Sequence, residues 1–111
     1  MVLQHVLAFN LIPSLSEADS NCKAVFDGIF NLKPTCVKPD GKTYIRSIKG
    51  GKQNSKEGAD KGIKWVFIVE FENEEDRDYY VHTDLVHAAL AKTLISQVAD
   101  IAVLDFTEGV F

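Results

Sequence analysis

His87 is the side chain of this sequence best placed to do chemistry, because it falls on the apolar face of a predicted helix. The helix begins near Asp84, and its apolar residues recur at helical spacing from His87: Leu90, Ala91, Leu94 and Val98. An imidazole can act as a general base near neutral pH and take a proton from carbon next to a carbonyl group. A histidine on an apolar face is also often a core residue with hydrogen-bonded ring nitrogens, so a structural role stays open beside the catalytic one.

A second histidine, His5, has a similar position in a predicted strand. Residues 2–11 are rich in branched and apolar side chains and end before Pro13, which favours a β-strand. The alternation of the strand puts His5 on the face of three apolar residues: Leu3, Leu7 and Phe9. Two imidazoles are therefore expected to point into the fold, whereas His82 stands at a helix end and is expected to be solvated.

The sequence predicts a helix and then a second strand after the strand of His5. Ser16 followed by Asp19 resembles a capping box, and it predicts a helix that runs to about Leu32. The apolar face of this helix consists of Ala18, Cys22, Val25, Phe26 and Ile29. Residues 43–49 predict a second strand that ends at Gly50-Gly51, which we interpret as a turn or a bulge because the phosphate-loop pattern is absent.

The second half of the chain completes the order of elements. Residues 63–72 form the clearest strand and are largely apolar on both faces. Asn73 caps a short acidic helix, the helix of His87 follows, and residues 100–107 close the chain as a strand. This order indicates an α+β, ferredoxin-like fold, in which a four-stranded antiparallel sheet carries its helices on one face. A second copy is the economical cover for the other face, so we predict a homodimer with a barrel-like interior.

The composition fits one soluble globular domain. The 111 residues are 46% hydrophobic and 25% charged, with a formal net charge of -4. Lysines and arginines are dispersed, so nucleic acid is not expected as a partner. No apolar run is long enough to span a membrane, and the N-terminus has no pattern of a secretion signal. Cys22 and Cys36 are too few for a disulfide scaffold, and we therefore expect a cytoplasmic protein with reduced thiols.

The three histidines do not form a convincing metal site. His82 and His87 are five residues apart across a helix boundary, and no carboxylate has a clear place beside them or beside His5. We expect no metal ion.

Several short pieces of the sequence together resemble one known family. They are His5 in the opening strand, the segment from Gly50-Gly51 to Glu57-Gly58, Val69-Glu70-Phe71-Glu72, Asp78-Tyr79-Tyr80, Asp84-Leu85-Val86-His87 and Val103-Leu104-Asp105-Phe106. In this order and spacing they resemble the stress-responsive dimeric alpha/beta barrel (Dabb) domain family, which includes olivetolic acid cyclase-like proteins. The resemblance covers nearly the whole chain and implies a single domain over residues 1–111. It also implies a small dimer without a cofactor. Known activities in the family include polyketide cyclisation and cyanohydrin cleavage, and other members are described only as stable, stress-induced proteins.

The resemblance also implies roles for individual residues. It puts the family's helix histidine at His87 and its first-strand histidine at His5. The family's tyrosine falls on Tyr80 when counted from the Phe71 strand, and on Tyr79 when counted by the Asp-Tyr pair. We expect His87 to be the base, one tyrosine to orient it or to hold the oxygen that becomes negative, and His5 to close the polar end of a pocket. The expected apolar lining consists of Leu7, Phe9, Trp65, Phe67 and Leu90.

The sequence departs from the family pattern at two positions near this site. Trp65 stands where the cyclase has a further pocket histidine, and Leu85 stands where a proline usually precedes the helix histidine. Three kinds of function therefore stay open. The protein is a cofactor-free cyclase-like or lyase-like enzyme acting on a small apolar carbonyl or aromatic compound, a hydrophobic-ligand-binding protein, or a non-catalytic stress-responsive dimer whose side chains fill the cavity.

Overall fold

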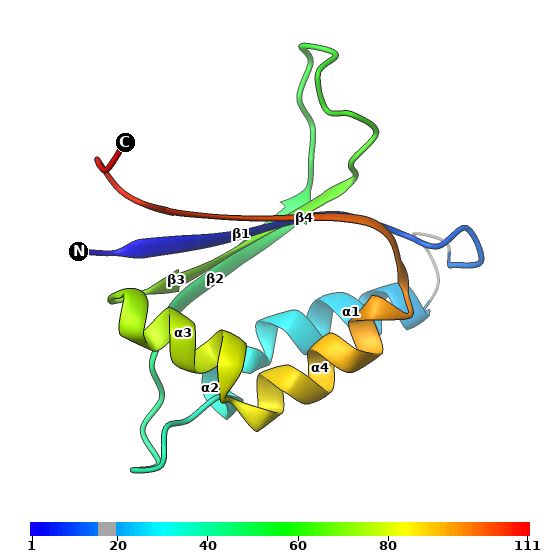
Figure 1. The fold of residues 1–111 in the computed structure, drawn as a ribbon. Coiled ribbons are helices and arrows are strands. Elements are labelled where there is room, and N and C mark those ends of the chain that lie inside the picture. The colour runs from blue at the N-terminus through cyan, green and yellow to red at the C-terminus, as the bar shows by residue number, and fades with distance from the viewer. Residues whose placement is uncertain (16–19) are drawn as a thin grey trace.

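The computed structural model describes residues 1–15 and 20–111 of the chain (Figure 1). The predicted capping box at Ser16 and Asp19, and Ala18 with it, lie outside these residues. The elements follow the predicted order, with their bounds as follows: β1 (Leu3–Leu11), α1 (Ser20–Phe30), α2 (Leu32–Thr35), β2 (Ile45–Lys52), β3 (Trp65–Phe71), α3 (Glu74–His82), α4 (Leu85–Ile95) and β4 (Val98–Thr107).

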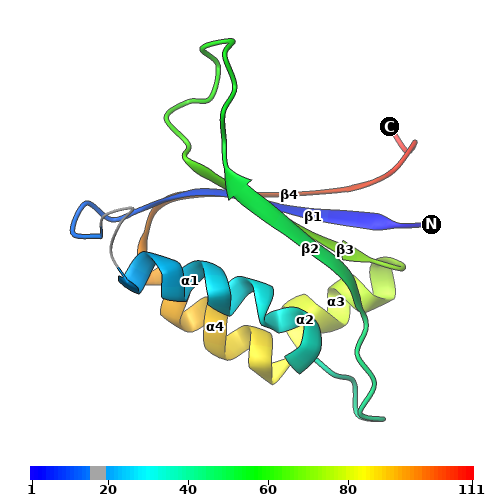
Figure 2. The same ribbon diagram turned by 180° about the vertical axis from the view of Figure 1, so that it is seen from behind.

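The four strands form one antiparallel sheet with the order β2-β3-β1-β4. All the helices lie on one face of this sheet, as the two opposite views in Figures 1 and 2 show. The α+β, ferredoxin-like arrangement predicted from the sequence is confirmed. The first strand is central and pairs with both β3 and β4, so His5 lies opposite Val69 on one side and Asp105 on the other.

Particular side chains explain where α3 begins and why α1 and α2 are separate helices. Asn73 caps α3 by accepting a hydrogen bond from the backbone N–H of Asp76 at 2.9 Å, as predicted. The single helix expected up to Leu32 is divided at Asn31 into α1 and α2. Pro34 explains the division, because proline has no N–H to donate to the carbonyl oxygen four residues earlier.

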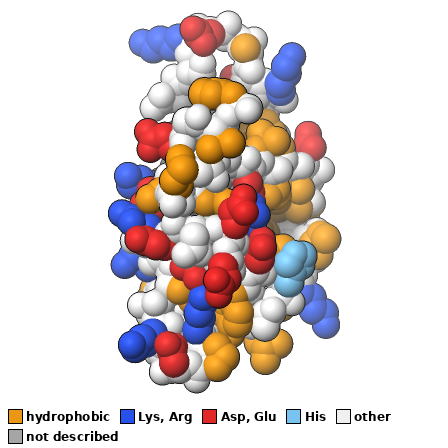
Figure 3. Space-filling model, turned by 60° about the vertical axis from the view of Figure 1, so that its left-hand side comes forward, with side chains coloured by type: hydrophobic (Ala, Val, Ile, Leu, Met, Phe, Trp, Pro, Cys, Tyr) orange, Lys and Arg blue, Asp and Glu red, His pale blue; other side chains and the backbone are white. Residues whose placement is uncertain are grey.

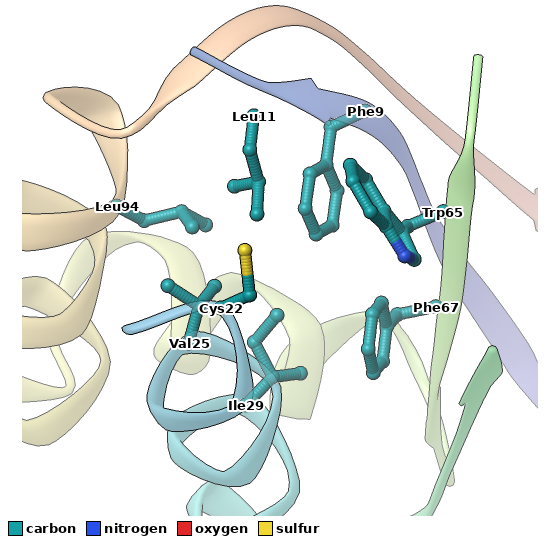
Figure 4. Close-up of a cluster of buried hydrophobic side chains, with 8 residues drawn as sticks. All are labelled: Phe9, Leu11, Cys22, Val25, Ile29, Trp65, Phe67 and Leu94. Atoms are coloured by element: carbon teal, nitrogen blue, oxygen red, sulfur yellow. The ribbon is translucent and has the colours of Figure 1, made fainter. Parts of the chain in front are cut away.

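Two groups of buried side chains hold the sheet against the helices. The first packs α1 and the end of α4 onto β1 and β3, and Figure 4 shows its members: Phe9, Leu11, Cys22, Val25, Ile29, Trp65, Phe67 and Leu94. The second lies nearer α2 and α3 and consists of Leu3, Leu32, Cys36, Ile45, Val69, Phe71 and Tyr80. Leu7, Ile48 and Leu90 pack against both groups and join them.

The prediction of a turn or a bulge at Gly50-Gly51 is wrong. Both glycines belong to β2, where Gly50 lies opposite Phe67 and Gly51 opposite Val66. A Cβ atom at Gly50 would stand 2.2 Å from Cδ1 of Phe67, so the ring occupies the space above a bare backbone. The irregularity of β2 lies instead between Ile45 and Ser47, and the strand continues to Lys52.

The face of the sheet opposite the helices is uncovered and largely apolar. The register places on it Val6, Ala8, Val66, Ile68, Leu104 and Phe106. The connection between β2 and β3, residues 53–64, projects from the same side of the sheet and we call it the arm (Figures 1 and 2). In Figure 3, hydrophobic side chains gather between the arm at the top and a group of acidic side chains near the centre.

β4 lies at an edge of the sheet and is exposed over nearly its whole length. Among the described residues, no helix is both long and apolar enough to cross a lipid bilayer.

Candidate functional site

His87 lies in the first turn of α4, half-buried and turned toward α3. Asp84 caps this helix: its Oδ1 accepts hydrogen bonds from the backbone N–H groups of Val86 at 2.9 Å and His87 at 3.2 Å. The imidazole stacks on the ring of Tyr80, with 3.8 Å between the ring centroids and 27° between the planes. The cap and the stack together fix both the backbone and the ring of His87.

Tyr80 joins the two histidines. It is almost fully buried in α3, and its ring meets that of His5 edge to face, with 5.7 Å between the centroids. Burial is the main reason that the pKa of its phenol is raised, and the negative charge of nearby Asp84 adds to the effect. The phenol therefore stays protonated near neutral pH and can donate a hydrogen bond. Three side chains expected at the site, His5, Tyr80 and His87, lie together.

These three side chains line a cavity of about 290 Å³ between the helices and the sheet. Apart from them, every lining residue is apolar: Leu7, Ile29, Leu32, Val81, Leu90, Ala91, Leu94, Ile95, Val98, Ile101 and Val103. The wall contributed by Ile95, Ile101 and Val103 is exposed, so the cavity opens between α4 and β4. A space of this kind accommodates a small, mostly apolar ligand whose polar group lies beside the imidazoles.

The environment of His87 favours the neutral imidazole. Its Nδ1 is buried and has no hydrogen-bond partner among the residues that the structure describes. Burial lowers the pKa of His87 from its ordinary value of 6.5, and the charge of His5 lowers it further. A backbone hydrogen bond with Tyr80 and the charge of Asp84 act in the opposite direction but do not cancel the effect. At neutral pH the ring is therefore in the form that accepts a proton.

His5 has a carboxylate partner that the sequence analysis did not assign. Its Nδ1 lies 2.7 Å from Oδ1 of Asp105, the residue opposite it in β4. The other oxygen of Asp105 accepts a hydrogen bond from Arg77 at 2.8 Å. The expectation that no carboxylate has a place beside the histidines is wrong, because the pairing of β1 with β4 unites residues 100 positions apart. An acidic residue on the strand face of Ile101 and Val103 was the available signal.

A hydrogen-bond network that the sequence did not predict surrounds the buried carboxylate of Asp84, the residue that caps the helix of His87. The hydroxyl of Tyr44 donates a hydrogen bond of 2.6 Å to Asp84 Oδ2, and the buried thiol of Cys36 lies near this carboxylate. Burial, reinforced by Asp84, raises the pKa of Cys36 to about 12 and also raises the pKa of Tyr44. Both groups therefore stay protonated, and Cys36 is an inert thiol and not a nucleophile.

Tyr79 lies outside the cavity. Its hydroxyl is 3.5 Å from the carbonyl oxygen of Val37, and its ring meets Tyr44 edge to face with 5.4 Å between the centroids. Of the two tyrosines that the family resemblance selects, only Tyr80 lines the cavity. His82 is exposed at the end of α3.

The expected apolar lining divides into two groups. Leu7 and Leu90 line the cavity. Phe9, Phe67 and Trp65 belong instead to the aromatic core under α1, where the rings of Phe9 and Phe67 stack with 5.9 Å between their centroids. The alternation pattern places all of them on the inner face correctly, but it does not say which helix covers which part of that face. Within residues 1–15 and 20–111, no three His, Cys, Asp or Glu side chains are grouped so that they could hold a metal ion.

Comparison with known proteins gives a family and a fold. The family model described as the stress responsive A/B barrel domain matches residues 3–108. No curated protein matches the chain. Among solved structures, hydroxynitrile lyase from Passiflora edulis has a TM-score of 0.82 at 16% identity, covering 99% of this chain and 96% of its own.

Two further structures are similar at comparable identity. A protein from Arabidopsis thaliana has a TM-score of 0.76 at 20% identity, with coverage of 98% of this chain and 97% of its own. A dimeric protein of unknown function with a ferredoxin-like fold from Bacteroides fragilis has a TM-score of 0.63 at 20% identity, with coverage of 95% and 94%. At such identities the likeness extends to the fold alone.

Proposed function

Because the chain belongs to the stress-responsive A/B barrel domain family, we propose that it is a cofactor-free enzyme that transfers protons on a small apolar carbonyl compound, with His87 as the base. One observation carries the proposal. His87 lines an apolar cavity, and its buried Nδ1 has no hydrogen-bond partner among the described residues. A buried nitrogen without a partner costs folding free energy. Its presence beside a cavity therefore supports a functional role for the ring.

The first reaction that this arrangement suits is a cyclase-like ring closure. Neutral His87 removes a proton from carbon next to a carbonyl group, and the resulting enolate carbon attacks a second carbonyl of the same molecule. A carbon–carbon bond forms, and the second carbonyl oxygen takes the negative charge and then the proton. In this proposal Tyr80 and His5 hold that oxygen by hydrogen bonds, because both lie at the polar end of the cavity beside His87.

The second reaction is a lyase-like cleavage of a cyanohydrin, the class of reaction named for the Passiflora edulis neighbour. His87 removes the hydroxyl proton, the carbonyl forms, and the bond to the nitrile carbon breaks. Cyanide leaves with the electron pair and takes up the proton as hydrogen cyanide. Both reactions need one neutral imidazole, one oxygen-binding donor and an apolar cavity.

An alternative function is the binding of a hydrophobic ligand without turnover. The observation that favours it is the lining, in which eleven of the fourteen residues are apolar. Binding and catalysis differ in one respect that can be measured, since only catalysis requires the proton on His87 to move.

We expect both histidine rings to respond to ligands in an NMR titration. The ring signals of His87 should titrate with a pKa below 6.5, because burial opposes the charged form. Saturation with benzaldehyde cyanohydrin or with an alkylresorcinol should shift the signals of His5 and His87 together, while those of exposed His82 stay in place. Rings that do not respond to any probe would identify a closed, structural core and contradict both enzyme and binding protein.

We further propose that the protein is a homodimer in which two sheets pack face to face. The uncovered face of the sheet carries apolar side chains from three strands, and burying it against an identical face removes this surface from water. The dimeric Bacteroides fragilis neighbour of the same fold supports the proposal.

Replacing Leu104 by lysine is expected to give a monomer. Leu104 lies on the uncovered face and is 66% exposed in the single chain, so a charge there would be buried without a partner in the dimer. Light scattering should report twice the chain mass of 12.3 kDa for the natural sequence and a single chain for Leu104→Lys. The matched control is Leu85→Lys on α4, where the side chain is 83% exposed and lies away from this face. Equal masses for the two variants would contradict the interface.

A further inference from the structure

Asp84 is almost fully buried, and its carboxylate receives hydrogen bonds from three groups. They are the backbone N–H of Val86, the backbone N–H of His87 and the hydroxyl of Tyr44. A protonated carboxyl would have to donate one hydrogen bond, whereas an ionised one only accepts, so three donors suit the ionised form.

The donors around Asp84 are all electrically neutral. Two are backbone N–H groups, and the third, the hydroxyl of Tyr44, keeps its proton because burial raises its pKa. Burial also raises the pKa of the nearby Cys36 thiol, which stays neutral. The described residues therefore hold the carboxylate in place without neutralising it. This situation contrasts with Asp105, which faces both His5 and Arg77.

His87 occupies a position that disfavours a positive charge. It is the third residue of α4, and the first turn of a helix carries the positive end of the helix dipole. The titratable groups that face the ring are His5 from β1, Tyr80 from α3 and Asp84 from the cap. Among these three, Asp84 alone is an anion, and it lies at the same helix end as the imidazole.

We propose that Asp84 is a positioning residue for His87: its carboxylate fixes the helix turn that carries the imidazole and stabilises the positive charge that the ring acquires on taking a proton. The inference rests on the proposed role of His87 as base. It adds that the base is supported through the helix cap and not by a carboxylate bonded to the ring, which is the arrangement found at His5.

The test is Asp84→Asn. Asparagine keeps the oxygen that accepts from Val86 and His87 and is as good a helix cap as aspartate, so the fold is expected to persist while the charge is lost. We expect the pKa of His87, followed by NMR, to fall by about 1. The acid limb of kcat/KM should move to lower pH by the same amount, and the plateau should fall by up to about 10-fold because the base is weaker.

Two further variants make the result decisive. Asp100→Asn removes one carboxylate from an exposed position of β4 and should leave the pKa of His87 unchanged. Tyr44→Phe removes one donor but keeps the carboxylate, so the pKa of His87 should stay or rise, and this variant also tests the proposal if Asp84→Asn does not fold. A folded Asp84→Asn protein with an unchanged His87 pKa would overturn the proposal and leave Asp84 with the role of a helix cap alone. A lower His87 pKa in Tyr44→Phe would overturn the proposal as well. The NMR readout needs no turnover, so it remains valid even if the proposed enzyme activity fails.

Discussion

Replacing His87 by alanine is expected to lower kcat/KM by about 100- to 10,000-fold, which is the range that general acid–base groups contribute. The reason is that His87 is the base of the proposed reaction, and alanine has no group that accepts a proton. The other imidazole that lines the cavity is that of His5, and its Nδ1 is already paired with Oδ1 of Asp105 at 2.7 Å. We therefore do not expect His5 to replace His87 as the base. Aldehyde release from benzaldehyde cyanohydrin and consumption of a linear polyketide thioester are the two assays that measure the loss.

The matched control for this prediction is His82→Ala. His82 is five residues away and exposed at the end of α3, so its loss should leave the rate unchanged. The dimer and the fold should survive in both variants, as judged by light scattering and circular dichroism. If His87→Ala unfolds, His87→Gln preserves more of the stack on Tyr80 and separates a structural role from a catalytic one. A folded His87 variant with full activity would remove His87 from the mechanism.

Gly50→Ala is expected to destabilise the fold by about 1–3 kcal/mol, the usual cost of overpacking a core. The added Cβ would stand 2.2 Å from Cδ1 of Phe67. The ring cannot retreat easily, because Phe9 and Phe26 stack on it, each with 5.9 Å between centroids. Denaturant unfolding monitored by circular dichroism would measure the change in the free energy of unfolding.

Gly51→Ala provides the neighbouring control. Its Cβ would meet no atom within 4 Å, although both glycines lie in β2. We expect its free energy of unfolding to stay within about 0.5 kcal/mol of that of the natural sequence, as for most surface substitutions. Equal destabilisation by the two substitutions would show that loss of glycine in β2 matters generally and that the close approach of Phe67 does not.

Periodicity in the sequence predicts the faces of elements well. His5 on the inner face of β1 and His87 on the inner face of α4 follow from spacing alone, and so does the start of the helix near Asp84. These properties are local, because a side chain's face depends on its neighbours along the chain.

Contacts between distant segments could not be predicted in the same way. Asp105 meets His5 only because β4 pairs with β1 in one particular register, and Tyr44 reaches Asp84 from the loop before β2. The place of Gly50 also depends on a distant residue. A pair of glycines is compatible with a turn, but it is equally compatible with a strand whose backbone packs closely against an aromatic ring, here that of Phe67. The alternation of residues predicts that Trp65 and Phe67 lie on the inner face of the sheet. Their place under α1, and not in the cavity, depends on how the helices lie across the sheet.

The cavity and the aromatic core are built from largely different residues. The aromatic rings under α1 are fully buried, whereas the wall at the mouth consists of side chains that are already partly in water, namely Ile95, Ile101 and Val103. Changes in the size of these three side chains cost less folding free energy than changes in the core, because 41% to 75% of their surface is already exposed. Mutation can therefore reshape the entrance while the sheet, α1 and the capped histidine keep their places. During evolution, the ligand specificity of this fold can therefore change at the entrance of the cavity while the core maintains the stability of the protein.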